Sequence, residues 1–469
     1  MASFSRGRSM TSASFNTLPL SEALRSNLVS LGYSTMTPIQ AQSLPHLLAG
    51  KDLVGQAQTG SGKTAAFALG ILQQLDPGYF NCQALVLCPT RELAAQVAEE
   101  FRRLATPLPN IKIITLCGGT PIGPQKASLE HGAHVIVGTP GRIDDHLRKK
   151  TLRLDRLRTL VLDEADRMLD MGFIDAITGI IRQTPKKRQT LLFSATFPSD
   201  IERLSSEFQS RPLRATVEQV KEKTTIRHQF FAVSKPKHKL ETLLKILGKQ
   251  QPESCLIFCK TRQGCAELAE ELKSRRHSAL ALHGDMEQKE RDLTLLRFSN
   301  GSARILVATD VAARGLDVEN LALVINHDMT SDAETWLHRV GRTGRAGKAG
   351  MAITLLTQAE LFRLDAVAPL LAQPIVLEEV QSLPSDLPLP EKPARVTLAL
   401  DAGRKNKLRP GDILGALTGE GGLPAAAIGK INIQDFSAYV AVARSHAREA
   451  LEHLQSGKVK GKSIRARRL

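Results

Sequence analysis

Cysteine and aromatic residues are scarce in this sequence. Its 469 residues include six Cys and one Trp, and Phe, Trp and Tyr together make up 4%. No two cysteines have the CxxC spacing and no His stands where it would complete a zinc site, which argues against a zinc-binding protein. We expect the thiols to be small buried side chains in a reducing compartment, the cytoplasm. They are Cys82, Cys88, Cys117, Cys255, Cys259 and Cys265.

Long apolar runs are also absent. No stretch approaches the roughly 20 consecutive apolar residues that a membrane span requires. The start of the chain, residues 1–15, has no apolar segment of the kind found in secretory signals. We therefore expect a soluble globular protein with a flexible tail at residues 1–17, without a membrane partner. An organellar transit peptide, which would also lack acids, is the weaker alternative.

Positive charge is in excess. Lys and Arg number 63 against 47 Asp and Glu, which gives a formal net charge of +16. Such a balance favours a polyanionic partner, because each neutralised phosphate releases condensed counterions. A basic chain that merely keeps itself soluble is the alternative, and motifs are needed to decide between the two.

The length and the pattern of apolar runs predict three domains. Short apolar runs alternate with helix-length amphipathic segments in two successive series, which is typical of parallel α/β structure. We expect the first α/β domain at 18–213, a polar interdomain linker at 214–225 and the second α/β domain at 226–378. A stiff proline-rich linker follows at 379–395. The last segment, 396–469, has the order β-α-β-β-α-β and predicts a small ferredoxin-like α+β domain.

A phosphate-binding loop stands out in the first domain. The segment AQTGSGKT at 57–64 lies between an apolar run and an alanine-rich helix. Glycines let backbone N–H groups surround phosphates, so Gly60, Ser61 and Gly62 should line the loop. Lys63 would reach the β and γ phosphates of ATP, and the Thr64 hydroxyl would face Mg²⁺. A simple glycine-rich turn is the alternative for this segment alone.

Acidic residues end a hydrophobic strand a hundred residues later. The run LVLDEAD at 160–166 places its carboxylates where a Mg²⁺ ligand must emerge to meet the loop across a parallel sheet. Asp163 should hold Mg²⁺ through water, and Glu164 is the candidate general base for the attacking water. The two motifs together predict an ATP hydrolase.

These residues, with others in order from Phe15 to Ala349, resemble a DEAD-box ATP-dependent RNA helicase, which implies two tandem RecA-like domains. The segment GYSTMTPIQ at 32–40 matches the Q motif of that family. The resemblance implies that Gln40 hydrogen-bonds the adenine edge, that Phe15 and Tyr33 stack on or frame the base, and that Thr37 shapes its pocket. Asp317 would accept a hydrogen bond from the ribose.

The family's RNA-backbone motifs occur in both α/β domains. PTREL at 89–93, the glycine pair at 118–119 and TPGR at 139–142 match the first domain, and three further motifs match the second. SAT at 194–196 would couple the acidic motif to the RNA side. HRVGRTGR at 338–345 would supply two arginine fingers, Arg342 and Arg345, and we group His338 with the catalytic residues. The implied RNA contacts are Arg91, Gly119, Thr139, Arg142, Thr261, Arg291, Thr309 and Asp310.

The last domain is strongly basic. It carries 13 Lys or Arg against 6 Asp or Glu, yet its only aromatic residues are Phe436 and Tyr439. Base stacking on the sheet, the usual mode of an RNA-recognition (RRM) domain, therefore looks unsuitable, and we favour a basic helix-loop face. The segment also resembles the tail of the DbpA subfamily of bacterial DEAD-box proteins. That resemblance implies docking on a large-subunit ribosomal RNA hairpin, with Lys405, Lys407 and Arg409 as contacts.

The sequence thus predicts a helicase that uses ATP and Mg²⁺ to remodel structured RNA locally, in pre-ribosomal particles during assembly of the large ribosomal subunit. A general mRNA helicase with a nonspecific basic tail is one alternative. An ATP-locked RNA clamp is another, although Glu164, Arg342 and Arg345 argue against a dead site. A DNA translocase fits least. We expect a monomer, and the sequence leaves oligomers open.

Overall fold

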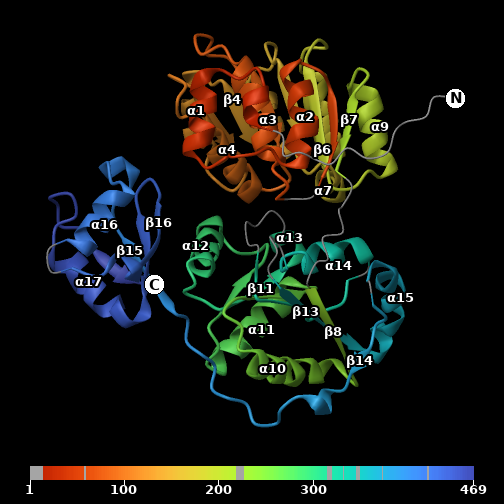
Figure 1. The fold of residues 1–469 in the computed structure, drawn as a ribbon, viewed down its shortest axis with the longest axis vertical. Coiled ribbons are helices and arrows are strands. Elements are labelled where there is room, and N and C mark those ends of the chain that lie inside the picture. Colours follow the sequence, from red (N-terminus) through yellow and green to blue (C-terminus); the bar gives the residue numbers. More distant parts are fainter. Residues whose placement is uncertain are drawn as a thin grey trace. The chain divides into compact units, whose positions relative to one another are not determined.

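The computed structural model describes residues 14–57, 60–217, 226–313, 320–330, 332–344, 349–371, 373–419 and 422–469. The chain divides into two compact units that meet in the sequence between residues 222 and 223. The first holds one parallel sheet, and the second holds another parallel sheet followed by a small antiparallel one (Figure 1). Within the described chain, no helix is long and apolar enough to cross a membrane.

The first domain is a seven-stranded parallel sheet with helices on both faces (Figure 1). Its strand order is β3-β4-β2-β5-β6-β1-β7. The strands are β1 (Leu53–Gln56), β2 (Ala84–Leu87), β3 (Ile113–Leu116), β4 (Val135–Gly138), β5 (Thr159–Leu162), β6 (Gln189–Ser194) and β7 (Leu213–Thr216). The helices are α1 (Glu22–Ser30), α2 (Pro38–Leu48), α3 (Lys63–Gln74), α4 (Arg91–Ala105), α5 (Ile122–Glu130), α6 (Pro140–Arg148), α7 (Ala165–Asp170), α8 (Ile174–Arg182) and α9 (Ser199–Phe208).

Burial on both faces explains why these strands are continuously apolar. Along β2, Val86 packs into one hydrophobic core, whereas Leu85 and Leu87 pack into a second core on the opposite face. Alternate residues of a strand point to opposite faces, so a strand covered by helices on both sides needs apolar side chains at every position. The carboxyl ends of the strands then form one edge, where the motif loops emerge.

One strand corrects the expected domain boundary. We placed the polar linker at 214–225, but β7 pairs in parallel with β1 from Leu213 to Thr216. Three of the four β7 residues are exposed, because this strand lies at the sheet edge. An edge strand needs little apolar surface, so its sequence reads as linker although its backbone completes the sheet.

The second domain repeats the architecture with strand order β10-β11-β9-β12-β13-β8-β14, again parallel. Its strands are β8 (Ile226–Val233), β9 (Cys255–Cys259), β10 (Ala279–Leu282), β11 (Ile305–Thr309), β12 (Leu323–Asn326), β13 (Gly350–Thr357) and β14 (Leu377–Glu378). Its helices are α10 (Lys239–Gln250), α11 (Arg262–Ser274), α12 (Gln288–Ser299), α13 (Asp310–Ala313), α14 (Ala333–Val340) and α15 (Leu364–Val367). The two tandem α/β domains expected from the sequence are therefore confirmed.

The third domain confirms the expected β-α-β-β-α-β order. Its antiparallel sheet has the order β16-β17-β15-β18, which is ferredoxin-like. Alternate residues of β15, such as Leu398 and Leu400, face a core shared with both helices. The elements are β15 (Arg395–Leu400), α16 (Pro410–Thr418), β16 (Ile428–Ile433), β17 (Ala438–Ala443), α17 (Ala447–Ser456) and β18 (Ala466–Arg468).

Candidate active site

The phosphate loop joins the end of β1 to the start of α3. Gly60 and Gly62 have φ values of 83° and 92°, which only glycine adopts without strain. Gly62 is the N-cap of α3 and offers no side-chain cap, so the first N–H groups of the helix face the loop. Lys63 is buried, and its Nζ donates a 2.7 Å hydrogen bond to the Ala57 carbonyl oxygen. An anion placed here would meet a helix N-terminus and an ammonium group.

The other predicted loop residues are accessible. Gly60 is exposed, and Ser61 and Thr64 are partly exposed on either side of the buried Lys63. Residues 58 and 59 lie outside the described chain. Because Thr64 is the second residue of α3, its hydroxyl stands in the first helical turn, as the sequence analysis expected.

The expected adenine sensor is attached to this loop. Thr37 caps α2 and forms a capping box with Gln40, whose Oε1 accepts from Thr37 N at 2.9 Å. Gln40 Nε2 donates to the Gly62 carbonyl oxygen at 3.1 Å. A Cβ added to Gly62 would come within 2.5 Å of the same Gln40 nitrogen. The amide of Gln40 therefore depends on the loop glycine for its position.

The expected aromatic frame is only partly accessible. Phe15 is buried, with its ring edge-on to Tyr33 at a centroid distance of 6.1 Å. The Tyr33 hydroxyl donates to Glu100, and burial followed by this hydrogen bond raises the Tyr33 pKa above its usual range. Stacking of either ring on the base remains a prediction.

The acidic motif begins where β5 ends. Asp163 is buried, and its Oδ1 has no hydrogen-bond partner within the described chain. Burial raises the Asp163 pKa to about 6, although the nearby Lys63 ammonium lowers it. A buried carboxylate oxygen without a partner is costly, and a bound cation or its water would satisfy it.

Glu164 occupies a strained backbone position. Its φ of 52° and ψ of 53° place a bulky non-glycine residue in the left-handed region, at the N-cap of α7. Such strain collects at functional sites. Glu164 Oε2 also accepts a 2.6 Å ion-pair hydrogen bond from Arg167 Nη1, and both side chains are nearly buried. Arg167 is a site residue that the sequence analysis did not single out. Its spacing, three residues after Glu164 on a helix, could have revealed it.

The SAT segment is tied to the acidic motif through Asp166. Asp166 Oδ2 accepts from the backbone N–H groups of Ala195 and Thr196 and from the Thr196 hydroxyl, at 2.9–3.1 Å. Asp166 N donates to the Ser194 hydroxyl. Burial alone would raise the Asp166 pKa, but the hydrogen bonds from Thr196 and Ser194 outweigh it and lower that pKa. The contact expected between the two motifs is therefore present.

Replacing Asp163 with Asn should stabilise the nucleotide-free protein above pH 6 in the presence of EDTA. The folded-state pKa of about 6 lies above the usual 3.8, so ionising the carboxyl costs the fold about 3 kcal/mol. The cost is absent below about pH 4, grows as pH rises towards 6 and stays constant above it. Thermal unfolding across this pH range should show that the stability of the Asn variant, relative to the wild type, increases with pH. An Asn variant that is less stable at pH 7.5 would contradict this placement of Asp163.

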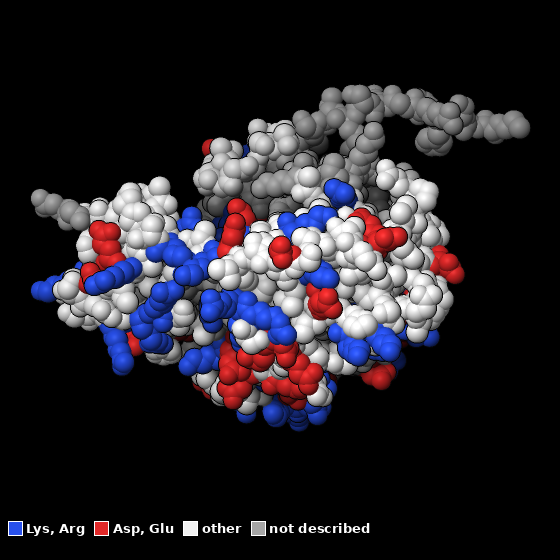
Figure 2. Space-filling model, turned by 90° about the horizontal axis from the view of Figure 1, so that it is seen from below, with Lys and Arg blue, Asp and Glu red and all other residues white. Residues whose placement is uncertain are grey.

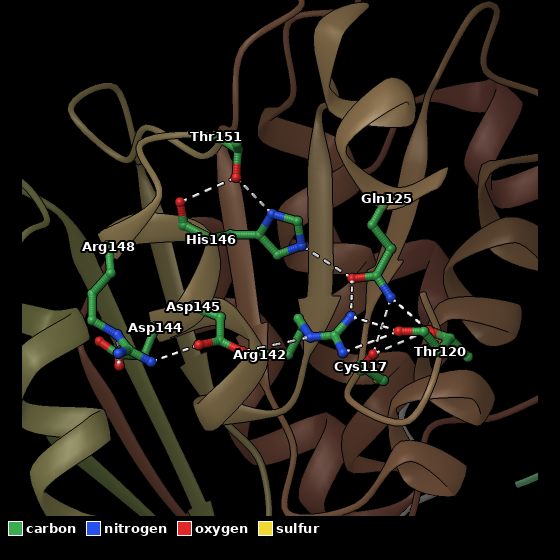
Figure 3. Close-up of polar contacts among 9 residues, drawn as sticks. All are labelled: Cys117, Thr120, Gln125, Arg142, Asp144, Asp145, His146, Arg148 and Thr151. Carbon is green, nitrogen blue, oxygen red and sulfur yellow. Dashed lines mark hydrogen bonds and ion pairs between the residues drawn. The ribbon is translucent and has the colours of Figure 1, made fainter. Parts of the chain in front are cut away.

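The first-domain RNA motifs meet around one glycine turn. Gly119 has a φ of 71°, and a Cβ there would lie 1.6 Å from Arg91 Nη1, so the Arg91 guanidinium packs directly against it. Arg142 donates from Nη1 and Nη2 to the Thr120 carbonyl oxygen, at 3.1 Å each (Figure 3). Thr139 is the N-cap of α6 and makes no side-chain cap hydrogen bond. The structure thus brings Arg91, Gly119 and Arg142 together.

In the second domain, two of the expected RNA residues begin helices. Thr261 caps α11 through a 3.0 Å hydrogen bond from Gly264 N. Thr309 ends β11 and is buried, and Asp310 starts α13. Arg291 lies in the first half of α12. Their contacts with RNA remain predictions.

Asp310 has an intramolecular partner that the sequence analysis missed. Both of its carboxylate oxygens accept from Arg339, at 2.6 and 2.7 Å. Arg339 is 3% exposed and also donates to Asn326 Oδ1 and to the Asp328 carbonyl oxygen. It shares the buried face of α14 with Trp336 and Val340, and an arginine in such an apolar stripe signals a buried partner.

Two of the expected nucleotide residues lie outside the described chain: Asp317 and Arg345. Arg342 is described and lies just after α14, with 4% of its surface exposed. His338 is partly exposed on the same helix.

One group of possible metal ligands has no support as a metal site. Ligand atoms of Cys259, His327 and Asp328 lie within 4.8 Å of one another. Burial and the Asp328 charge raise the Cys259 pKa well above its usual value, and the Lys239 ammonium lies 3.3 Å from Asp328 Oδ1. A neutral thiol and a competing cation make the group a poor metal site.

In the third domain, two basic segments lie side by side. Lys460 Nζ donates to the Lys407 carbonyl oxygen at 2.6 Å and lies 3.5 Å from Asp412 at the start of α16. This joins the segment containing Lys405, Lys407 and Arg409 to the basic end of the chain. Figure 2 shows Lys and Arg side chains grouped on this domain, at the left of the view. The sheet face opposite the core carries Tyr439 beside small residues such as Ala399 and Ala441, so it offers little for base stacking.

Family profiles match three stretches of the chain. The profile described as DEAD/DEAH box helicase matches residues 37–204. The helicase conserved C-terminal domain matches residues 238–347. The DbpA RNA binding domain matches residues 397–468. Each match falls within one of the three folded domains.

Individual proteins resemble the chain over most of its length. The ATP-dependent RNA helicase DbpA of Escherichia coli (strain K12) is 52% identical over 458 residues, covering 97% of this chain and 99% of that protein. The DEAD-box ATP-dependent RNA helicase CshA of Bacillus subtilis (strain 168) is 43% identical over 353 residues, which cover 75% of this chain and 71% of that protein. Among solved structures, Saccharomyces cerevisiae Dbp5 bound to RNA and ADP BeF3 is similar with a TM-score of 0.71 and 30% identity, covering 79% of this chain and 96% of that one.

Proposed function

This chain belongs to the DEAD-box ATP-dependent RNA helicases of the DbpA type, and on that premise we propose that it remodels ribosomal RNA during assembly of the large ribosomal subunit. We further propose that it acts in the cytoplasm as a monomer, on a large-subunit RNA hairpin within pre-ribosomal particles. A general mRNA helicase and an RNA clamp are the alternatives that experiment must separate from this function.

The observation that carries the ribosomal proposal is the basic face of the third domain. Lys460 bonds the Lys407 backbone although 53 residues separate them, so two basic segments form one surface. Lys407 has a φ of 59°, which fixes the loop in a left-handed turn. A shaped basic surface recognises a folded RNA element better than a flexible charged tail, because its charges are held in place before binding.

The ATP site is proposed to contain Mg²⁺ held by Thr64 and Asp163. The partnerless Asp163 oxygen beside the Lys63 ammonium fits that cation. When bound there, the cation would supply positive charge that offsets the negative charge of the ATP phosphates. Gly60, Ser61 and Gly62 would surround the phosphates with backbone N–H groups, and Lys63 would add an ammonium contact. Gln40 would read adenine, and Asp317 would accept from the ribose.

Glu164 is proposed as the group that polarises the attacking water. The Arg167 ion pair holds its carboxylate in a fixed orientation, as a general base requires. Arg342 and Arg345 would supply positive charge to the γ phosphate when ATP and RNA bring the two α/β domains together. ATP hydrolysis would then depend on RNA, and each ligand would strengthen binding of the other.

The RNA strand is proposed to lie along the motif loops of both α/β domains. Contacts to sugar and phosphate carry no sequence information, so the third domain would choose the RNA and the other two would distort it. Separating a base-pair step costs about 1.4 kcal/mol, so a local bend opens only a few pairs. The link between Asp166 and Thr196 would pass the state of the ATP site to the RNA side.

The test is the ATPase rate at fixed salt with no RNA, with arbitrary RNA and with a large-subunit ribosomal RNA fragment that carries the hairpin. The fragment should stimulate hydrolysis at a concentration at least about tenfold lower than arbitrary RNA does. Replacing Lys405 and Arg409 with Gln, and Lys407 with Asn, should remove that preference. Asn tolerates the left-handed backbone of Lys407, so the loop keeps its shape.

A matched triple variant separates specific contacts from net charge. Lys249, Lys273 and Arg448 are exposed cations outside the basic loop, and replacing all three with Gln removes the same charge. This control should retain the preference for the ribosomal fragment. If all RNAs stimulate ATP hydrolysis equally, the general mRNA helicase replaces the ribosomal proposal. If the protein binds ATP and RNA tightly but does not hydrolyse ATP, the result supports the RNA clamp.

A further inference from the structure

A partly buried glutamine joins the loops of the first-domain RNA motifs. Gln125 lies on α5, outside every segment that the sequence analysis singled out. Its Nε2 donates to the Cys117 carbonyl oxygen at 3.0 Å and to Thr120 Oγ1 at 2.7 Å. Its Oε1 accepts from Arg142 Nη1 at 3.0 Å (Figure 3). One amide therefore holds the turn at 117–120 and the start of α6 at the same time.

The contacts fix which way this amide points. The Cys117 carbonyl oxygen can only accept a hydrogen bond, so the nitrogen of the Gln125 amide must face it. The amide oxygen then faces the Arg142 guanidinium, which can only donate. In a flipped amide, the amide oxygen would face the Cys117 carbonyl oxygen, and the amide nitrogen would face the Arg142 guanidinium. Neither contact could form a hydrogen bond, so the orientation is unique.

His146 also contacts the amide oxygen of Gln125. It is fully buried on α6, and its Nε2 lies 3.0 Å from Gln125 Oε1, while its Nδ1 lies 2.8 Å from Thr151 Oγ1 (Figure 3). Because the amide oxygen only accepts, Nε2 carries the proton. Burial and the neighbouring Arg142 charge lower the His146 pKa, which favours this neutral imidazole.

The network fixes the orientation of the Arg142 guanidinium. Its Nη1 is engaged by Thr120 and Gln125, and its Nη2 donates once to the Thr120 carbonyl oxygen. Its Nε also lies 4.0 Å from Asp145 Oδ2. The side chain is 11% exposed, so a small, directed part of the group reaches the surface.

We propose that Gln125, supported by His146, is a positioning residue for RNA binding that holds Arg142 and the turn around Gly119 in the geometry a sugar-phosphate backbone requires. The inference rests on the proposed RNA contacts of Arg142 and Gly119. A network satisfied before RNA arrives spares the complex the cost of ordering these groups. Its loss therefore weakens RNA binding and leaves the ATP site, formed by other loops, intact.

Replacing Gln125 with Ala tests this proposal in the full chain. The RNA concentration for half-maximal ATPase should rise about tenfold, because two acceptors and a guanidinium lose their hydrogen-bond partner. The ATPase rate at saturating RNA and the KM for ATP should stay within about twofold of wild type. In an Arg142→Ala background, Gln125→Ala should add little further loss, since both changes break one network.

A pair of His146 variants supplies the rescue. Leu at this position removes the donor and should weaken RNA binding severalfold, whereas Gln can place an N–H near the Nε2 position and should restore it. Gln183→Ala is the matched control, because the exposed Gln183 amide donates to the Gly179 carbonyl oxygen and belongs to none of the RNA motifs. It should leave RNA binding unchanged.

Three results would overturn the inference. The first is unchanged RNA binding in Gln125→Ala. The second is a loss of RNA binding from Gln125→Ala that adds fully to the loss from Arg142→Ala. The third is a fall in both the saturated ATPase rate and the thermal stability of Gln125→Ala, together with RNA binding that His146→Gln does not restore. A wild-type enzyme that RNA fails to stimulate would instead overturn the proposed function itself. Weaker RNA binding in Arg142→Ala but not in Gln125→Ala would remove only the positioning role.

Discussion

Glu164→Gln should lower RNA-stimulated ATP hydrolysis by about 10²–10⁴-fold, while ATP and RNA still bind. Gln preserves the size of the side chain but cannot take a proton from water. The Arg167 ion pair, at 2.6 Å, orients the native carboxylate, and the left-handed backbone of Glu164 fixes where it points. The measurements are the hydrolysis rate at saturating RNA and the affinity for a fluorescent ATP analogue.

A glutamate away from the site provides the control for this variant. Glu207 is about half exposed and lies 3.6 Å from Arg182, so Glu207→Gln removes one surface charge of the same kind. Its hydrolysis rate should match the wild type, because exposed ion pairs contribute little. Activity of Glu164→Gln within tenfold of wild type would remove Glu164 from the role of general base.

Arg342→Ala should lower the saturated ATPase rate by about 10³-fold or more. An arginine finger stabilises charge that develops on the transferring phosphoryl group, so its loss affects the rate more than ATP binding. Lys at this position should recover little activity, because its ammonium lacks the planar fork of guanidinium. The kcat and KM for ATP are measured at saturating RNA.

Arg275→Ala is the comparison for the finger variant. Arg275 is 42% exposed and, just after the end of α11, pairs with Glu271 of that helix, so its removal should leave kcat unchanged. A large rise in the KM for ATP with unchanged kcat in Arg342→Ala would instead assign Arg342 to ground-state binding.

The sequence predicted the elements that carry strong patterns. Buried parallel strands such as β2 and β9 are uninterrupted apolar runs, and the phosphate loop and acidic motif follow strands β1 and β5 as expected. The order of the third domain was also predictable, because its strands alternate around one core. β7 was misread as linker, since an edge strand carries polar residues.

Partners of the motif residues were not predictable in the same way. Gln125 bonds Arg142 across 17 residues, and Arg339 bonds Asp310 across 29, so only the folded chain brings them together. Arg339 is buried and Gln125 is partly buried. Local patterns identify the groups that contact ligands, whereas tertiary packing decides which groups hold them.

The most direct test of the central claim is strand separation measured against duplex length. Duplexes of about 10 and about 30 base pairs are attached to the same ribosomal hairpin and incubated with enzyme and ATP. Local remodelling predicts ATP-dependent separation of the short duplex and almost none of the long one. Equal separation of both would indicate a translocating helicase, and no separation of either would contradict the assignment of RNA unwinding to this chain.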